Sequence, residues 1–446
     1  MSGRNEVTKE RIVEAIISRE DMRSRYYKEI VPIIGKDAAV ELERLYDIYD
    51  ERLYVWMATL WDPKIGGFYF SSSGRDCDAF LPDIESTVQI LRFTESSGLI
   101  SGMGKTYAQA VPGSMRESLL KFAKGLQDPE DGFFYHPQWG KNIITPRRSR
   151  DLRWATDMIS RFGDKPYYPT PIDKNDDGSS SALLPKYLQD INEWKNYLAS
   201  FDMKTKSYWS ANMISSQAIQ IGAAGPEFIN TLFQWLADCQ RSDNGLWEPQ
   251  VNYASVNGLM KLSLLYSNLG VCMPNADKAI KSAITVALSN EPIVFCCQFY
   301  NPFATMSNVL ENMRLHGDEF EAHKLQKIIL ERAADLIRVT REKVLTCKRA
   351  DGSFSYNPEP RSRLSQKAPV GLGLDEGDVN ASAICSTGVT SNLCKVLGIR
   401  RIPIFCDKDA KIFFDIIDNA IQTQKIYVKP DWFDDAINPN KIREMQ

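Results

Sequence analysis

The segment with the densest set of reactive side chains is FYHPQWGKNIITPRRSRDLRWATD, residues 134–157. It places His136 and Trp139 a few residues before Arg147 and Arg148. A histidine can exchange a proton near neutral pH, and arginine guanidinium groups bind carboxylates in a fork geometry. A hydrogen-bonded structural histidine and a solvated arginine cluster are the alternatives. We therefore take this segment as a candidate rim of a binding site for an anionic ligand.

Three further segments carry side chains of the same kinds. Tyr253 and Asn257 lie four residues apart, the spacing that places two side chains on one face of a helix. Tyr300 and Asn301 follow in a later apolar segment, where a tyrosine could equally fill apolar space. The last segment adds an aromatic residue, a cation, an amide and two acids, namely Tyr356, Arg361, Gln366, Glu376 and Asp378.

Two reactions fit these residue types. In a lyase, an asparagine or arginine neutralises the carboxylate of a uronate sugar, so that a tyrosine or histidine can remove the C5 proton. The predicted proton-transfer residues are then His136, Tyr253 and Tyr300. Ligand binding is assigned to Trp139, Arg147, Arg148, Asn257, Asn301, Tyr356, Arg361, Gln366 and Asp83.

A glycoside hydrolase needs instead two carboxyl groups that flank the scissile bond, roughly 6.5–9.5 Å apart for inversion of configuration. Glu85 and Glu376 are the candidate catalytic acids, with Asp83 and Asp378 as alternates. Asp83, Asp151 and Asp378 each precede a helical pattern, so N-capping of a helix is another role for them. Basic residues outnumber unpaired acids on the first segment, which favours the lyase slightly.

A repeated helix–loop–helix unit must position these residues. The loops DPKIGGFYFSS, QDPEDGFFYHPQ, QRSDNGLWEPQ and RADGSFSYNPE each join an apolar helical run to a second helix with a polar start. Their reference glycines are Gly67, Gly132, Gly245 and Gly352, and the last two intervals are close to twice a period of about 55 residues. Glycine permits the positive φ or close approach that such a turn needs. Segments 207–225 and 299–313 are the predicted missing members of the repeat.

Two helices of about 14 residues plus loops fit this period. We predict an all-α fold, a closed α/α toroid of six or seven helical hairpins with few or no strands. It forms a single domain over residues 1–446, in which residues 1–35 are an N-terminal helical extension and residues 425–446 a C-terminal tail. In a closed ring, the loops that enter the inner helices line one mouth of a central cavity, where the candidate residues would meet.

Composition limits the partners. The chain has 446 residues, of which 43% are hydrophobic and 25% charged, and a formal net charge of −3. The absence of a basic excess argues against a nucleic-acid partner, and no stretch approaches the roughly 20 apolar residues of a membrane span. The nine cysteines include no C-x-x-C pair, which favours free thiols in a reducing cytoplasm over disulfides or a zinc site. We expect no metal and no cofactor, and a small-molecule or oligosaccharide substrate.

The repeated unit also resembles a known motif. The segment WLADCQRSDNGLW is similar to the repeat of squalene-type cyclases through Trp235, Leu236, Gln240, Gly245 and Trp247. The chain thus resembles the α/α-toroid superfamily. This superfamily includes terpenoid cyclases, protein prenyltransferases and six- or seven-hairpin carbohydrate enzymes such as polysaccharide lyases and glycosidases.

This resemblance implies alternatives. In a terpenoid cyclase, the stretch DIEST, residues 83–87, would supply the acid as Glu85 or Asp83. Prenyltransferases hold zinc with an Asp, a Cys and a His, and the histidines of this chain show no matching spacing. A non-catalytic α-solenoid that binds a partner on its concave surface is a third alternative. A cavity ringed by Trp, Tyr, Arg, Asn and carboxylates suits a sugar, so an enzyme that cleaves an anionic oligosaccharide is the leading prediction.

Overall fold

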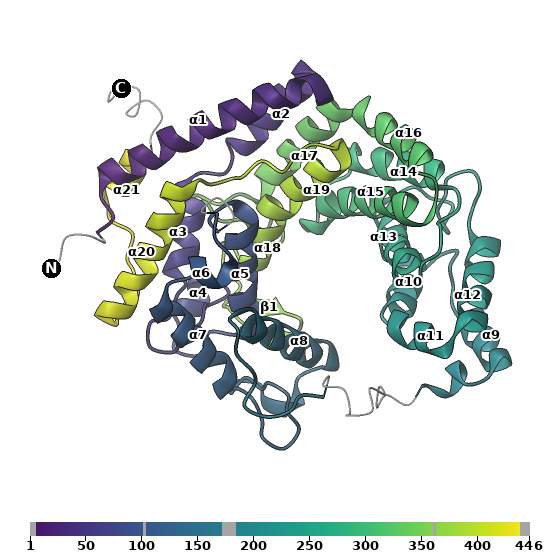
Figure 1. Cartoon of the computed structure of the whole chain (residues 1–446), viewed down its shortest axis with the longest axis horizontal. Helices are drawn as coiled ribbons and strands as arrows, with labels where there is room; N and C mark the ends of the chain where they lie inside the picture. The colour runs from purple at the N-terminus through teal and green to yellow at the C-terminus, as the bar shows by residue number, and fades with distance from the viewer. Residues whose placement is uncertain (1–5, 101–103, 172–183, 360–362, 438–446) are drawn as a thin grey trace.

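The chain folds into a curved array of α-helices, which the computed structural model shows in Figure 1. The structure describes residues 6–100, 104–171, 184–359 and 363–437. The prediction of an all-α protein is confirmed. In this part of the chain, the strands β1 (Leu364–Ser365) and β2 (Ala368–Pro369) form one short antiparallel hairpin. None of the helices described here combines the length and hydropathy of a bilayer span.

One layer of helices follows the concave side of the array (Figure 1). We call its members the inner helices. They are α5 (Ile84–Ser97), α8 (Thr145–Arg161), α10 (Ser207–Ser215), α13 (Tyr253–Asn268), α15 (Cys297–His316) and the continuous run of α18 (Val379–Ala383), the π-helical turn η4 (Ile384–Gly388) and α19 (Val389–Leu397).

An outer layer covers the inner helices. It consists of α1 (Lys9–Ile34), α2 (Lys36–Tyr46), α3 (Glu51–Thr59), α7 (Gly113–Gly125), α9 (Ile191–Ala199), α12 (Pro226–Cys239), α14 (Ala276–Ala287), α16 (Glu319–Leu330), α17 (Ala333–Cys347) and α20 (Asp407–Thr423). The connections contain α4 (Ser72–Arg75), α6 (Tyr107–Ala110), α11 (Ala218–Ala224), α21 (Phe433–Ala436), η2 (Gly140–Asn142) and η3 (Lys186–Leu188).

The sequence pattern of the outer helices explains their position. In α14, for example, small and aliphatic side chains recur every three or four residues and are buried. This spacing gives a helix one apolar stripe, which must pack against a neighbour to leave water. The stripe consists of Ala276, Ala279, Ile280, Ala283, Ile284 and Ala287. It packs against α15 and α16, so the inner and outer layers share one continuous apolar core.

Neighbouring inner helices run in the same direction. Residues in the first turns of one helix contact residues at the start of the next, and this places the N-terminal ends together at one side of the array. The contacting pairs are Asp83–Arg147 between α5 and α8, Ser207–Glu248 between α10 and the loop before α13, Asn257–Asn301 between α13 and α15, and Cys296–Tyr356 between α15 and the loop before α18.

The predicted glycine loops share one backbone pattern. In the first loop, the N–H of Gly66 donates to the carbonyl of Asp62, and the N–H of Asp62 donates to the carbonyl of Gly67, both at 2.9 Å. The other loops repeat these two bonds with small variations. The glycines with positive φ at this position are Gly66, Gly132, Gly245 and Gly352. The first loop therefore turns at Gly66, and the choice of Gly67 was wrong by one residue.

Gly352 shows why this position must be a glycine. Its φ is 86°, and a Cβ there would lie 2.7 Å from the backbone nitrogen of Leu53 in α3. The loop before α18 thus packs directly against the first hairpin of the array. The last and first hairpins are neighbours in space although they lie some 300 residues apart in the chain.

The array has one open side in Figure 1, between α8 and the pair α10 and α11. The chain between α8 and α9 passes through residues 172–183, which lie outside the described residues. Closure of the array into a complete toroid of six or seven hairpins therefore stays a prediction.

The N-terminal helix α1 is an integral part of the fold. Arg19 is 5% exposed and forms ion pairs with Glu51 at the start of α3 and with Asp409 in α20. Arg23 is equally buried and donates to the carbonyl oxygen of Ile404 at 2.6 Å. Burying two guanidinium groups is costly unless each is hydrogen-bonded or paired. Helix α1 is thus held in place by polar contacts as well as by its apolar face.

Replacement of Gly352 by alanine tests the turn geometry. We expect Gly352→Ala to lower the free energy of unfolding by about 1–3 kcal/mol, because alanine is strained at this φ and its Cβ would press on α3. Chemical denaturation would measure the change. The matched control is Gly125→Ala in the last turn of α7, where nothing lies within 4 Å. The free energy of unfolding of this control should stay unchanged or rise by up to about 1 kcal/mol. Equal losses in the two variants would contradict the role of the turn.

Candidate functional site

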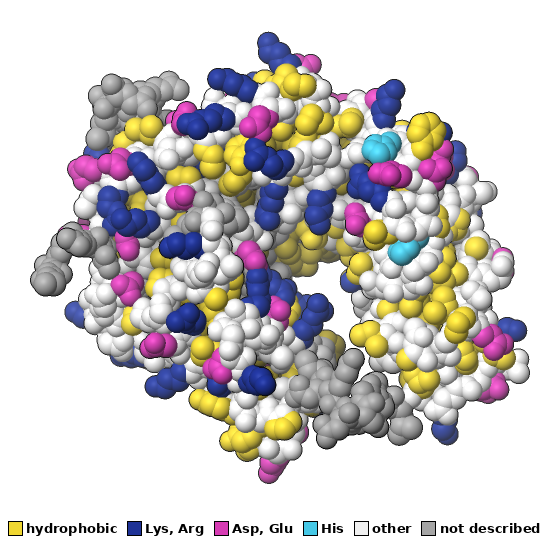
Figure 2. Space-filling view, in the orientation of Figure 1, with side chains coloured by type: hydrophobic (Ala, Val, Ile, Leu, Met, Phe, Trp, Pro, Cys, Tyr) yellow, Lys and Arg dark blue, Asp and Glu magenta, His cyan; other side chains and the backbone are white. Residues whose placement is uncertain are grey.

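A hollow opens at the centre of the array, bordered by the inner helices (Figure 2). We call this hollow the lumen. Lysine and arginine side chains gather on its rim beside α8 (Figure 2). The N-terminal ends of the inner helices lie at one end of the lumen, and side chains cap α5, α13 and α18 there.

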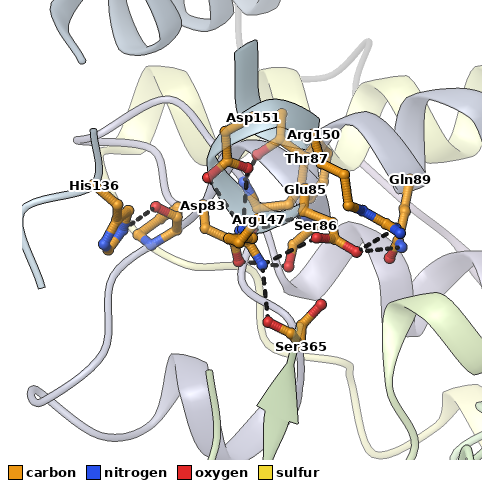
Figure 3. A network of polar contacts seen from close by, with 12 residues as sticks. Asp83, Glu85, Ser86, Thr87, Gln89, His136, Arg147, Arg150, Asp151 and Ser365 are labelled. Carbon is orange, nitrogen blue, oxygen red and sulfur yellow. Dashed lines mark hydrogen bonds and ion pairs between the residues drawn. The ribbon is translucent and has the colours of Figure 1, made fainter. Parts of the chain in front are cut away.

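Arg147 is the centre of a buried charge cluster (Figure 3). Its side chain has 0% exposure. The Nη2 group donates to Asp83 at 2.5 Å, Nη1 lies 3.1 Å from Glu85, and Nε donates to both oxygens of Asp151 at 3.1 and 3.0 Å. The Nη1 group also donates to the carbonyl of Ser365 in β1 at 3.3 Å. The guanidinium is therefore saturated by protein groups and is not available to a ligand.

Asp151 is not the helix cap that the sequence suggested. Helix α8 begins at Thr145, so Asp151 lies inside it, whereas Asp83 and Asp378 do cap α5 and α18. Burial raises the pKa of Asp151 to about 7, despite the bond from Arg147. The negative charges of Asp83 and Glu85 act in the same direction as burial, and both compete with Asp151 for the Arg147 guanidinium.

His136 lies at the edge of this cluster with both ring nitrogens occupied. Nε2 is 3.0 Å from the carbonyl oxygen of Pro82, and Nδ1 accepts from the N–H of Gln138 at 3.2 Å. The imidazole stacks on Trp139 at 3.9 Å between ring centroids, and Trp139 also lies 5.1 Å from the Arg147 guanidinium. Burial lowers the pKa of His136, so the ring is neutral at neutral pH. These contacts give His136 and Trp139 a packing role beside Arg147.

Glu376 and Asp378 hold loops rather than face the lumen with free oxygens. Glu376 is buried and accepts hydrogen bonds from Ser71 and from both the backbone and the hydroxyl of Ser73, at the start of α4. Asp378 caps α18 through the N–H of Ala381 at 2.7 Å and also accepts from the N–H of Tyr356 at 3.0 Å. Each acid thus joins segments that are distant in sequence.

Tyr253 and Asn257 contact different elements, although they are four residues apart on α13. The Tyr253 hydroxyl accepts a hydrogen bond from Lys343 of α17 at 2.9 Å. The Asn257 side chain accepts from the Asn301 amide of α15 at 2.9 Å. The Asn257–Asn301 pair therefore joins two inner helices, whereas Tyr253 contacts the outer helix α17.

Arg150 extends the Arg147 cluster to the lumen. It lies on the next turn of α8 and donates to Glu85 at 2.7 Å, and its side chain is 36% exposed. Its guanidinium also lies 4.7 Å from the indole of Trp154. Gln89, one turn after Glu85, connects this group to Asn380 of α18 at 3.1 Å. Arg150 is thus a cation with one side held by protein and the other side open.

Lys261 of the inner helix α13 is a cation without a counterion among the described residues. It follows Asn257 by four residues on α13 and is half-buried, and no hydrogen bond or ion pair reaches its ammonium from the described residues. Its ionisable neighbours are the Cys297 thiol and Arg150. Burial lowers the pKa of Lys261, and the charge of Arg150 acts in the same direction. A neutral amine is therefore reached at lower pH than for an exposed lysine.

Tyr300 lies on the neighbouring helix α15, and Tyr300 and Lys261 both have the Cys297 thiol as a neighbour. It follows Cys297 by three residues in α15, and its hydroxyl bonds to Asn392 of α19. A Cβ added to Gly388 would lie 3.0 Å from the Tyr300 ring, so the glycine makes room for this side chain. Burial raises the pKa of Tyr300, which keeps the phenol protonated at neutral pH.

The remaining predicted residues lie around these groups. The Tyr356 hydroxyl is 3.4 Å from the Cys297 sulfur. Arg148 stacks over Phe133, outside the buried cluster. Gln366 is exposed in the turn between β1 and β2. Arg361 lies outside the described residues.

Sequence reasoning missed Lys261, Gln89 and Asn380, and it did not single out Arg150. A search one helical turn beyond each candidate residue would have found two of them, because Gln89 and Lys261 each follow a candidate residue by four positions. Asn380 and the charge state of Lys261 carry no such signal, since they depend on which helices become neighbours.

Comparisons with known proteins add no identification. No family model, no curated protein and no solved structure matches this chain. Within the described residues, no group of three or more His, Cys, Asp or Glu side chains is arranged to hold a metal ion. A cavity of about 780 Å³ between α1 and the segment before α20 is lined by none of the predicted site residues.

The raised pKa of Asp151 predicts a pH-dependent stability. Between about pH 4 and 7 the unfolded chain releases this proton while the folded chain retains it, so the contribution to stability falls as pH rises. Asp151→Asn removes this term. Between pH 5 and pH 7.5, we expect the free energy of unfolding of the variant to rise by roughly 1–3 kcal/mol relative to that of the unmodified protein, as denaturation experiments would measure. Asp157→Asn, on an exposed turn of the same helix, should show no such trend. Parallel stability curves for Asp151→Asn and the unmodified protein would refute the assignment.

Proposed function

We propose that this protein is a carbohydrate-active enzyme of the α/α-toroid type, which binds an anionic, uronate-containing oligosaccharide in the lumen and cleaves it by β-elimination. The observation that carries the proposal is the pair of half-buried cations Arg150 and Lys261, of which Lys261 has no counterion among the described residues. Leaving a cation desolvated and unpaired lowers stability, and a ligand carboxylate would remove that cost.

The toroid assignment rests on the order of contacts. Inner helices pack in sequence from α10 through α13, α15 and α19, and the α18 end of the last run packs against α5, which in turn packs against α8. Gly352 brings the last hairpin against the first. Closure requires only that the segment between α8 and α10 complete the ring. The lumen would then be an enclosed cavity with a polar lining.

The chemistry assigns one role to each group. Arg150 and the amides of Asn257 and Asn301 bind the uronate carboxylate and withdraw charge from it, so that the C5 proton becomes acidic. The neutral amine of Lys261 removes this proton, and the electron pair forms the double bond between C4 and C5. The phenol of Tyr300 protonates the departing C4 oxygen. The lowered pKa of Lys261 and the raised pKa of Tyr300 match a base and an acid in these roles.

The carboxylates favour this reaction over hydrolysis. A hydrolase needs one carboxylic acid that is protonated and a second carboxylate that is free to act on water or on the sugar. Glu85 is bound by Arg147 and Arg150, Glu376 by Ser71 and Ser73, and Asp83 and Asp378 serve as helix caps. The same pairing of Glu85 removes support for a cyclase mechanism, in which it would have to protonate an alkene.

Lys261→Met is the decisive variant. With uronate oligosaccharides as substrates, we expect kcat to fall by about 10²–10⁴, because the proton acceptor is lost. The ultraviolet absorbance of the unsaturated product would measure the rate. Activity of the unmodified protein should rise with pH as Lys261 loses its proton. Lys278→Met on the outer helix α14 is the matched control and should leave the rate unchanged.

Two outcomes would refute the proposed mechanism, and a third would refute the substrate class. One is the release of new reducing ends without an unsaturated product, which would indicate a hydrolase. The other is full activity in Lys261→Met, which would move the base elsewhere. Failure of a whole panel of uronates to bind or react would remove the anionic sugar as the substrate class.

A further inference from the structure

Lys343 of α17 is a second lysine with an unusual environment, and it lies outside the lumen. Its side chain is buried, with 8% of the residue exposed. The Nζ atom donates to the Tyr253 hydroxyl and to the carbonyl oxygen of Ala287 at the end of α14, both at 2.9 Å. No carboxylate of the described residues lies within ion-pair distance of it, since the acids Glu291 and Glu342 are farther away.

The two acceptors fit a neutral amine. An ammonium has three N–H donors, whereas a neutral amine has two donors and one lone pair. Tyr253 and Ala287 satisfy two donors and carry no charge, because burial raises the pKa of Tyr253 to about 12. The described residues offer Nζ no third hydrogen-bond acceptor, so a third N–H of an ammonium would be satisfied only by solvent. The protein environment therefore favours the form of Lys343 that has a free lone pair.

Lys343 also lines a cavity of about 400 Å³. Ile293 and Val339 contribute apolar walls, and Glu291 and Glu342 lie at exposed positions of the lining. A cavity of this size accommodates a small organic molecule. The two acids disfavour an anionic ligand, because they place negative charge at the same opening.

We propose that Lys343 is a nucleophilic amine that forms an imine with small uncharged aldehydes in this cavity. The lone pair of Nζ attacks the carbonyl carbon and forms the C–N bond, and a proton moves from nitrogen to oxygen to give a carbinolamine. Loss of the hydroxyl group, with a proton from solvent, and of the second nitrogen proton to solvent yields the imine and one water molecule. The step needs no oxidant or reductant.

This reaction requires a neutral amine, and part of Lys343 is neutral at near-neutral pH. Burial lowers the pKa of Lys343 to about 8, and the negative charge of Glu291 opposes this shift. The neutral fraction at pH 7.5 is then on the order of 100-fold larger than for an exposed lysine with an ordinary pKa. Tyr253 acts as a positioning residue, since its hydroxyl fixes one N–H of the amine.

Reductive alkylation of the intact protein tests this inference. The full chain is treated with limiting propanal and sodium cyanoborohydride from pH 6.5 to 9.5, and propylated peptides are counted by mass spectrometry. We expect Lys343 at pH 7.5 to react at least about tenfold faster than Lys278 and Lys281, which are exposed on α14. Its labelling should reach half its maximum near pH 8, whereas the two reference lysines should still rise at pH 9.5.

A charge variant distinguishes a reactive role of Lys343 from a role in capping a helix. Glu342→Gln removes an exposed acid from the cavity lining and should leave the fold intact. We expect it to increase labelling of Lys343 by glyoxylate, an anionic aldehyde, several-fold while changing labelling by propanal little. If Lys343 reacts less than about tenfold faster than Lys278, or glyoxylate labelling does not respond, Lys343 only caps the end of α14 and the proposal fails.

Discussion

Arg147 has no exposed side-chain surface, and three carboxyl groups surround its charged guanidinium. Two of these come from the start of α5 and one from α8 itself, and a carbonyl of β1 supplies a further acceptor. A buried ion is tolerated only when such partners are all in place. The start of α5, the first turns of α8 and the β1–β2 hairpin are therefore fixed relative to one another. The position of Arg150 at the lumen follows from this arrangement, because it lies on the next turn of the same helix.

The polar residues of the molecule fall into two groups with different surroundings. Asp83, Glu376 and Asp378 are saturated by backbone N–H groups, hydroxyl groups or Arg147, which is typical of residues that hold loops. Lys261 and Lys343 are buried in part or in full and have no carboxylate beside them. Unpaired basic groups of this kind are costly to the fold, and such groups cluster at functional sites. The two lysines, rather than the acids, therefore have surroundings typical of functional groups.

The glycine loops connect local geometry to overall shape. Each turn glycine is in a conformation that other residues adopt only with strain, and the backbone of another segment lies against it. In this way the same short hydrogen-bond pattern, used in several loops, holds successive hairpins at a similar spacing. At Gly352, the same pattern places the last hairpin against the first. The hairpins therefore form a curved array around a lumen.

Much of the architecture was accessible from local sequence patterns. Apolar periodicity, N-capping aspartates at 83 and 378 and the glycine–aromatic loops predict helices joined by tight turns, because each of these signals acts within a few residues. The exact turn glycine of the first loop and the helical position of Asp151 were missed. Both depend on where a helix starts, which local preference defines only to within a few residues.

The candidate site shows the opposite balance. The sequence determined which residue types were present and which of them shared a helix turn, as for Asn257 and Lys261. Tertiary structure alone decided that Arg147 would form ion pairs with acids, that both nitrogens of His136 would be hydrogen-bonded, and that Lys261 would stay unpaired. Desolvation and pairing depend on neighbours that are tens to hundreds of residues away, and no local pattern records which of those neighbours will face a given side chain.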